Sequence, residues 1–189
     1  KKKKSIGQKN REHKIIFMGR LVKSKNLPKL LDCAQLLKKK IPDFCLDIYG
    51  NGPLQEEIEN RIRDYNLTNN VHLCGFTKDK NIYDDYSLQW ITSDFEGFGL
   101  VIIEAKANGV PTISTNWGDG VYEVIHDQKD GFVEDSNEGI VNKTVELLNN
   151  KELLINISNN ALTNFDEFSK KNAYIRWKEI LSNFEGGIN

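Results

Sequence analysis

Short apolar runs alternate with segments of helical spacing along most of this chain, and this alternation limits the possible folds. Six runs have the length and hydrophobic content of buried strands, at residues 15–18, 45–49, 71–74, 88–92, 111–115 and 131–133. The segments between them carry apolar residues three and four positions apart, as amphipathic helices do. Strands that alternate with helices in this way form a parallel sheet covered on both faces. The sequence therefore predicts an α/β, Rossmann-like domain with a parallel sheet of about six strands.

The predicted domain spans residues 15–184, and its last part is helical. Apolar residues recur at helical spacing over residues 140–148, 153–162 and 173–184. Residues 1–14 are polar and strongly basic and are interpreted as a linker, and residues 185–189 are interpreted as a tail. Because the chain begins with Lys rather than Met, we expect it to be part of a longer protein.

Composition and charge argue against several classes of protein. Charged residues make up 28% of the chain and the net charge is −1, which gives no argument for a nucleic-acid or membrane partner over the whole chain. No apolar run approaches the roughly 20 residues that cross a bilayer. We therefore expect a cytoplasmic protein. The basic residues at the start leave open a peripheral contact with acidic lipid on the inner face of the membrane.

The cysteines match no recognised spacing for metal or redox chemistry. Cys33, Cys45 and Cys74 are odd in number and widely separated. They are predicted to be reduced thiols in the core of a cytosolic protein. The three histidines are equally scattered and are interpreted as surface or structural residues.

A glycine-rich loop after the fourth predicted strand runs directly into a helix and has the features of an anion site. Gly97 and Gly99 permit close approach of the backbone to a ligand. Good helix formers follow from Leu100, so the unpaired N–H groups and the positive end of the helix dipole face this loop. Glu96 and Glu104 bracket the site with seven residues between them. Since carboxylates repel phosphate but accept hydrogen bonds from hydroxyls, the stretch predicts a ligand with phosphate in the middle and hydroxyls at both ends.

A second loop places two cations at the end of the first predicted strand. Arg20 and Lys25 lie between that strand and a helix that begins near Leu27. Loops at the carboxyl ends of the strands are where open α/β sheets bind their ligands. Two cations there would neutralise a diphosphate, and Arg could bind it through two parallel hydrogen bonds.

The two glutamates and the residues around them resemble the E-x7-E motif of retaining glycosyltransferase family 4. The match consists of Glu96-Gly-Phe-Gly-Leu followed by Glu104-Ala. In that family the motif lies in the C-terminal, nucleotide-sugar-binding domain, so this chain would be one half of a GT-B fold. The resemblance implies that Glu96 contacts the transferred sugar and that Glu104 contacts the ribose hydroxyls. It implies further that the diphosphate lies near the loop and helix start, at Gly97, Phe98, Gly99, Leu100 and Val101.

The cationic loop also resembles that family. Gly19-Arg20-Leu21, with Lys25 five residues after the Arg, is similar to the family's Arg/Lys phosphate pair. The family often has Gly after this Lys, whereas this chain has Asn26.

Two more segments extend the resemblance, which spans about residues 15–184 with its parts in family order. Gly50-Asn51-Gly52-Pro53 is similar to a Gly-x-Gly-Pro turn of the family. The turn after the third predicted strand lines the nucleobase in the family, which makes Phe76 and Thr77 candidates for the base pocket.

The resemblance implies the donor-binding domain of a retaining glycosyltransferase of polysaccharide biosynthesis. The complete enzyme would transfer a sugar from a nucleoside diphosphate sugar, by family frequency a UDP sugar, to a glycan or lipid-linked acceptor. We expect the acceptor to bind through an N-terminal domain outside this chain, so that the chain alone is inactive. Arg20, Lys25 and the helix start would stabilise the leaving diphosphate. No Asp-x-Asp lies where a divalent ion would be expected, so neither a metal nor a cofactor is predicted.

Two alternative functions stay open on the sequence. A nucleotide-sugar epimerase of the GT-B fold would need acid and base groups around the sugar, and incubation of the complete protein with donor alone would produce a new epimer. A non-catalytic nucleotide-sugar-binding subunit would act with a separate partner chain, and a second α/β domain upstream would exclude it.

Overall fold

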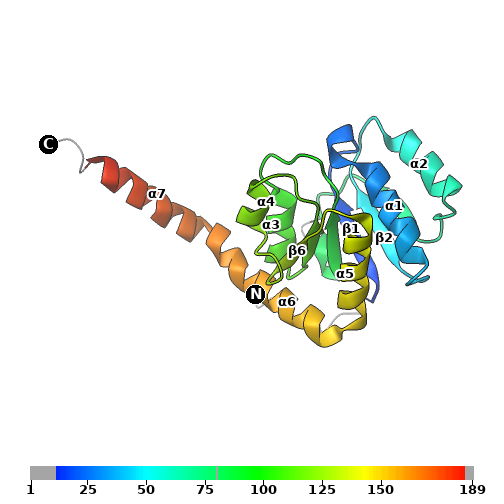
Figure 1. Cartoon of the computed structure of the whole chain (residues 1–189). Coiled ribbons are helices and arrows are strands. Elements are labelled where there is room, and N and C mark those ends of the chain that lie inside the picture. Colours follow the sequence, from blue (N-terminus) through cyan, green and yellow to red (C-terminus); the bar gives the residue numbers. More distant parts are fainter. Residues whose placement is uncertain (1–11, 80, 186–189) are drawn as a thin grey trace.

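Six parallel strands form the sheet of the computed structural model, which describes residues 12–79 and 81–185 (Figure 1). The strands are β1 (Lys14–Met18), β2 (Cys45–Tyr49), β3 (Val71–Gly75), β4 (Leu88–Ile91), β5 (Thr112–Ser114) and β6 (Gly131–Val133). Their order in the sheet is β3-β2-β1-β4-β5-β6, and each neighbouring pair is parallel. The predicted parallel sheet is confirmed. Most of the predicted linker, residues 1–11, and residues 186–189 of the predicted tail lie outside the described residues.

Helices cover both faces of the sheet. One face is covered by α1 (Leu27–Lys38), α2 (Gln55–Asp64) and α5 (Asn137–Asn149). The other carries the 3-10 turn η3 (Ile82–Asp85), α3 (Leu100–Ala107) and α4 (Gly120–Val124). Then α6 (Lys151–Asn164) contacts both α3 and α5, and the turn η4 (Phe165–Phe168) links it to α7 (Lys170–Glu185).

Strand β1 supplies core residues to both layers. Ile15 and Phe17 are fully buried in the cluster that includes α1, α2 and α5. Ile16 is fully buried on the other side, with Tyr83 and Tyr86. Because both faces are covered, the strand reads as a continuous apolar run rather than as an alternating one.

The loop after β1 is more regular than the sequence indicates. It contains a 3-10 turn, η2 (Lys23–Lys25), and then Asn26 with φ 45°. Asn tolerates this left-handed conformation better than other residues with side chains, so this position does not require glycine. Its side-chain oxygen accepts a hydrogen bond from the Lys29 amide at 3.2 Å and so caps α1.

The prediction of core thiols is right for Cys33 and wrong for Cys74. Cys33 is buried, Cys45 is half-buried and Cys74 is exposed. Strands β2 and β3 lie at one edge of the sheet. On the side of the sheet away from α1 and α2, alternate residues of these strands keep contact with solvent. Cys74 lies on this side, so it is exposed although its neighbours in the sequence are apolar.

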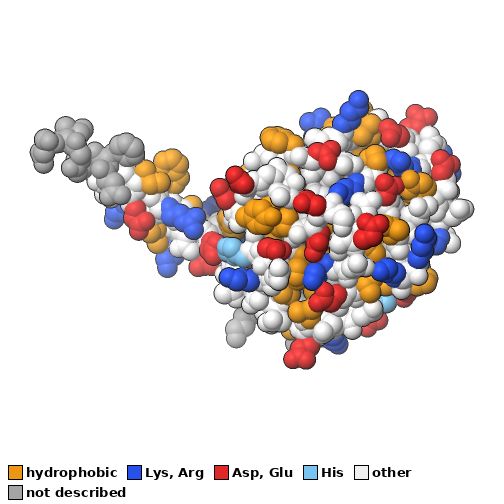
Figure 2. Space-filling model, viewed as in Figure 1, with side chains coloured by type: hydrophobic (Ala, Val, Ile, Leu, Met, Phe, Trp, Pro, Cys, Tyr) orange, Lys and Arg blue, Asp and Glu red, His pale blue; other side chains and the backbone are white. Residues whose placement is uncertain are grey.

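Helix α7 extends away from the rest of the domain (Figure 1). Its large apolar side chains are exposed at Tyr174, Ile175, Trp177, Ile180 and Leu181. Among the described helices, none combines the length and the hydropathy that a membrane span requires. Positive and negative side chains are interspersed over the face of the molecule in Figure 2, so that this face carries no large patch of one sign.

The turn after β2 lies directly against the backbone of the loop after β1. Gly50 has φ 141°, and a Cβ atom there would lie 1.8 Å from the carbonyl oxygen of Gly19. At Gly52 a Cβ atom would lie 2.3 Å from the carbonyl oxygen of Leu21. The Leu21 amide donates to the carbonyl oxygen of Asn51 at 3.0 Å. Glycine at these two positions therefore allows the two loops to touch.

We predict that Gly50→Ala lowers the free energy of unfolding by about 3 kcal/mol or more, since it combines an unfavourable φ with a clash against backbone. Gly97→Ala is the matched control, because a Cβ atom there would meet nothing within 4 Å. That control should change stability by less than about 0.5 kcal/mol. Urea denaturation of both variants, followed by circular dichroism, measures the difference, and equal losses would contradict the close approach as the cause.

Candidate functional site

The order of the sheet reverses at β1. The chain adds β2 and β3 on one side of β1, and β4, β5 and β6 on the other. The helices that follow β1 and β4, α1 and α3, therefore lie on opposite faces of the sheet, and open α/β sheets bind ligands in the crevice at such a point. The residues that the sequence predicts for the site lie in loops at this edge or on α3.

Hydrogen bonds join the loop after β1 to the loop after β4. The Asp94 amide donates to the carbonyl oxygen of Ser24 at 2.9 Å. Asn26 Nδ2 donates to Asp94 Oδ1 at 2.8 Å, and Thr92 Oγ1 donates to the carbonyl oxygen of Lys25 at 3.1 Å. The two loops therefore form one unit across the point where the sheet order reverses.

Lys25 and Glu96 form an ion pair at the centre of this unit. Lys25 Nζ lies 2.6 Å from both Oε1 and Oε2 of Glu96, and the two side chains are 18% and 9% exposed. Ser93 Oγ donates to Glu96 Oε1 at 2.6 Å. The sequence assigned Lys25 and Glu96 to different parts of a ligand, and the structure brings their charges into direct contact. Arg20, on the same loop as Lys25, is exposed.

The start of α3 has no side-chain cap, and the residues on either side of Gly99, Phe98 and Leu100, are exposed. Gly99 is the residue before the helix, has φ 73°, and gives no side-chain cap. A Cβ atom at Gly99 would lie 3.1 Å from Ile102, while one at Gly97 would meet nothing within 4 Å. The first N–H groups of a helix have no partner within the helix. Together with the helix dipole, they make this end suitable for an anion.

Two neighbouring cavities lie at the carboxyl ends of β1, β2 and β3 and share Met18 and Thr77. The first has a volume of about 300 Å³ and is lined by Met18, Gly19, Arg20, Tyr49, Gly50, Asn51, Phe76 and Thr77. The second has a volume of about 390 Å³ and is lined by Met18, Thr77, Lys78, Asp79, Ile82, Tyr83, Glu104, Ala107 and Asn108. Both volumes lie within the range of small-molecule sites.

Glu104 lies at the mouth of the second cavity. Partial burial of its carboxyl raises its pKa above the ordinary value. Below it the Tyr83 hydroxyl donates to the carbonyl oxygen of Val101 at 3.2 Å. Burial, and then the charge of Glu104, raise the pKa of Tyr83, so the phenol stays protonated. Glu104 thus presents an acceptor to the cavity from the middle of α3.

The predicted site residues divide into those whose side chains line the two cavities and those whose side chains do not. Arg20 and Phe76 line the first cavity, Glu104 lines the second, and Thr77 lines both. The side chains of Phe98 and Leu100 line a separate hollow next to α7.

Sequence reasoning missed Met18, Tyr49 and Ser93. Met18 and Tyr49 are the last residues of β1 and β2, so their position at the carboxyl ends of two predicted strands was a usable signal. Ser93 had no distinguishing signal, because a buried serine next to Glu96 depends on the path of the loop.

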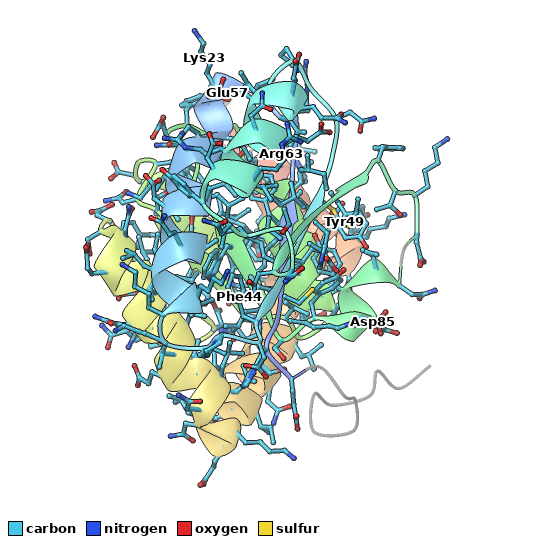
Figure 3. The ribbon with its side chains drawn as sticks, turned by 90° about the vertical axis from the view of Figure 1, so that its right-hand side faces the viewer. Lys23, Phe44, Tyr49, Glu57, Arg63 and Asp85 are labelled. Atoms are coloured by element: carbon cyan, nitrogen blue, oxygen red, sulfur yellow. The ribbon has the colours of Figure 1, made fainter. Side chains whose placement is uncertain are left out.

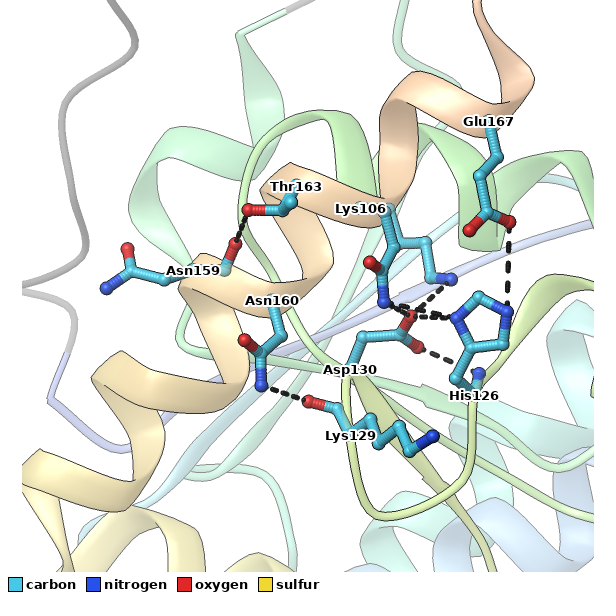
Figure 4. Close-up of polar contacts among 9 residues, drawn as sticks. Lys106, His126, Lys129, Asp130, Asn159, Asn160, Thr163 and Glu167 are labelled. Carbon is cyan, nitrogen blue, oxygen red and sulfur yellow. Dashed lines mark hydrogen bonds and ion pairs between the residues drawn. The ribbon is translucent and has the colours of Figure 1, made fainter.

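A buried polar cluster around Asp130 anchors α3 through Lys106 (Figure 4). Lys106 Nζ lies 2.8 Å from Asp130 Oδ2, and both side chains are at most 2% exposed. Asp130 Oδ2 also lies 2.9 Å from His126 Nδ1 and accepts from Asn164 Nδ2 at 2.7 Å. The His126 amide donates to the other oxygen of Asp130 at 3.0 Å. The cluster joins α3 to the segment between α4 and β6 and to the end of α6.

We predict that Asp130→Ala lowers the free energy of unfolding by about 3–5 kcal/mol, because it leaves the Lys106 charge buried without a partner. Glu146→Ala is the control, since it removes an exposed pair in which Lys143 Nζ lies 2.7 Å from Glu146 Oε2. The control should cost less than about 1 kcal/mol. Chemical denaturation of the two variants compares these values, and a small loss in Asp130→Ala would show that the cluster contributes little.

Comparisons with known proteins agree with this architecture. Residues 1–163 match the family described as glycosyl transferases group 1. Over 176 residues the chain is 31% identical to poly(glycerol-phosphate) alpha-glucosyltransferase of Bacillus subtilis, covering 90% of this chain and 26% of that protein. The structure is similar to that of a TarM mutant from S. aureus in complex with Fondaparinux, alpha-GlcNAc-glycerol and UDP. That match has a TM-score of 0.86 at 28% identity and covers 93% of this chain and 36% of the other.

A third match covers most of both chains. It is the C-terminal domain of a glycosyl transferase group 1 family protein (LpcC) from Francisella tularensis, with a TM-score of 0.73 at 26% identity. The match covers 83% of this chain and 85% of that one. By contrast, the chain spans half or less of the length of the first curated relatives that it matches.

Proposed function

This chain belongs to the glycosyl transferases group 1 family, and we propose that it is the donor-binding domain of a retaining glycosyltransferase of family 4. The proposed donor is a UDP sugar, and the proposed acceptor is a glycan or a lipid-linked glycan. The observation that carries the proposal is the convergence of two ligand-sized cavities, the exposed Arg20 and an uncapped helix start at one edge of the sheet. A nucleoside diphosphate fits this arrangement, because its nucleoside can fill the cavities while its diphosphate contacts Arg20 and the helix start.

The nucleoside would occupy the cavities. Glu104 would accept hydrogen bonds from the ribose hydroxyls at the second cavity, as its place at the mouth supports. Phe76 is 68% exposed beside the first cavity, and Thr77 lies between the two. The base would therefore lie against the turn after β3.

The diphosphate would lie across the start of α3. As the glycosidic bond breaks, negative charge grows on the diphosphate, and groups already aimed at that position lower the barrier. Arg20 and the backbone N–H groups that follow Gly99 are suited to this role, since both are present before the ligand arrives. No metal is needed for this charge balance.

The ion pair of Lys25 with Glu96 would link the diphosphate to the sugar. The ammonium group has three N–H donors, and both Glu96 oxygens lie 2.6 Å from it. Lys25 can therefore hold the Glu96 carboxylate oriented towards the sugar while it directs a donor to a phosphate oxygen. Ser93 Oγ donates a further hydrogen bond to Oε1 of the same carboxylate.

The acceptor would bind to a part of the protein outside this chain. The chain covers half or less of the first curated relatives that it matches, and it is similar to a C-terminal domain over 83% of its own length. The names of two relatives, a poly(glycerol-phosphate) glucosyltransferase and TarM with UDP bound, support a UDP-linked donor and a polymeric acceptor.

We predict that this chain alone binds UDP and transfers no sugar, because only closure of two domains completes such a site. Titration calorimetry with UDP tests the binding, and a radiolabelled UDP-sugar assay with the isolated chain and with the full-length protein tests transfer. Robust transfer by the isolated chain would contradict the proposal that this chain binds only the donor and that the acceptor binds elsewhere in the protein. A new epimer formed by the full-length protein from donor alone would favour the epimerase instead.

The two glutamates should differ in their response to substitution. Glu104→Ala should weaken UDP binding about 10-fold or more, because a charge-assisted contact to ribose is lost. Glu96→Ala should not weaken UDP binding, because UDP lacks the sugar and Lys25 stays available to the diphosphate, and it should lower turnover strongly in the full-length protein. Glu57→Ala serves as the control for both, because Glu57 is exposed on α2. Unchanged UDP affinity in Glu104→Ala would remove the ribose assignment.

Arg20→Ala should weaken the binding of UDP more than that of uridine. The contact between Arg20 and the diphosphate should contribute about 1.5–3 kcal/mol to UDP binding. Uridine has no phosphate and does not make this contact. Arg63→Ala provides a matched control, because Arg63 is exposed at the end of α2 and lines neither cavity. Calorimetry with both ligands decides the matter, and equal losses for UDP and uridine would indicate a remote effect.

A further inference from the structure

Three metal-ligating side chains meet on the side of the sheet away from α1 and α2. Cys45 and Asp47 are two residues apart on β2, so they lie on the same side of the sheet. His72 on β3 lies opposite Asp47 in the strand register. Tyr49, the next residue on this side of β2, is labelled in Figure 3, where it lies away from α1. The strand pairing thus brings together residues that are distant in the sequence.

We propose that Cys45, Asp47 and His72 bind a zinc ion. Their ligand atoms all lie within 4.8 Å of one another. Sulfur, imidazole nitrogen and carboxylate oxygen are the ligands that zinc prefers in proteins. The site is distinct from the diphosphate position, and the inference does not depend on the proposed transferase function.

The triangle of ligand atoms has nearly the size that zinc requires. Cys45 Sγ lies 3.4 Å from Asp47 Oδ1 and 3.6 Å from His72 Nδ1, and His72 Nδ1 lies 2.9 Å from Asp47 Oδ1. Zinc bonds of about 2.3 Å to sulfur and about 2.0–2.1 Å to nitrogen and oxygen, at tetrahedral angles, give edges of about 3.5, 3.5 and 3.3 Å. Two edges already match, and the third needs to lengthen by a few tenths of an ångström.

The carboxylate is held in the orientation that this site needs. The Tyr86 hydroxyl donates to Asp47 Oδ2 at 2.6 Å, and it lies 3.1 Å from the Tyr49 hydroxyl. The other oxygen, Oδ1, is left to face the thiol and the imidazole. Hydrogen bonds of this kind orient metal ligands and raise metal affinity. Three protein ligands at a partly exposed position leave the fourth place for water.

Metal binding would replace a proton at the site. Burial, and then the charge and hydrogen bond of Asp47, raise the pKa of the Cys45 thiol to about 11, while Lys14 lowers it and Cys74 raises it. The ion displaces this proton and binds the thiolate and a neutral imidazole, so that the two negative ligands balance the charge of the ion. Affinity should therefore fall as the pH is lowered, because protons compete with the ion for the same ligand atoms.

Cobalt(II) and zinc titrations of the 189-residue chain test the proposal. We expect one equivalent of cobalt to produce a sulfur-to-metal charge-transfer absorption, which zinc then removes by displacement. Cys45→Ser should abolish this absorption, and His72→Gln should weaken zinc binding by at least about tenfold. Cys74→Ser is the matched control, since it removes the neighbouring exposed thiol on the same side of the sheet. It should keep both the absorption and the affinity.

A measurement on the unsubstituted chain guards against variants that do not fold. At a pH high enough to ionise the free thiol, zinc should protect Cys45 from alkylation, as read by mass spectrometry, while exposed Cys74 stays reactive. The proposal is overturned if cobalt gives no charge-transfer absorption, if that absorption survives Cys45→Ser, or if zinc leaves the alkylation of Cys45 unchanged. Equal zinc affinity in all variants would show adsorption to surface carboxylates and would overturn it as well.

Discussion

The pairing of β1 with both β2 and β4 is the constraint on which the rest of the site depends. Because the chain adds strands first on one side of β1 and then on the other, the loops after β1 and β4 meet at the carboxyl edge. Their contact is made by backbone and short polar side chains, such as Asp94 with Ser24 and Asn26. The glycines after β2 hold the same loop from the opposite side, since a side chain at Gly50 would overlap Gly19. The cationic loop is therefore fixed between two neighbours before any ligand binds.

The region contains both a neutralised ion pair and an exposed cation. Lys25 and Glu96 neutralise each other in a half-buried position, and a lone charge of either sign there would carry a desolvation cost. Arg20 stays exposed at the rim of the first cavity. An anionic ligand would thus meet the exposed Arg20 and an uncapped helix start, while the neutral pair sets the position of a carboxylate close by.

The sequence predicted most of the fold because β1 to β6 are short apolar runs separated by clear loop signals. It predicted the loops of the site for the same reason, since each follows a recognisable strand. Contacts between distant loops have no local signal: nothing near Lys25 indicates Glu96, and nothing near Lys106 indicates Asp130. The same limit applies to Cys45 and His72, which strand register brings together although their spacing matches no metal motif. The misassigned Cys74 shows that hydrophobicity along a strand does not indicate whether an edge strand is covered on both sides.

Helix α3 carries Glu104 towards a cavity and Lys106 into a buried ion pair. Two residues apart on a helix, these side chains point about 200° away from each other. Rotation of α3 about its axis would move Glu104 only by pulling Lys106 away from Asp130. The buried ion pair therefore opposes rotation of this helix. The segment before the helix is less closely packed, since a Cβ atom at Gly97 would meet nothing within 4 Å. Ligand binding should therefore change the conformation of the glycine-rich loop more readily than the orientation of α3.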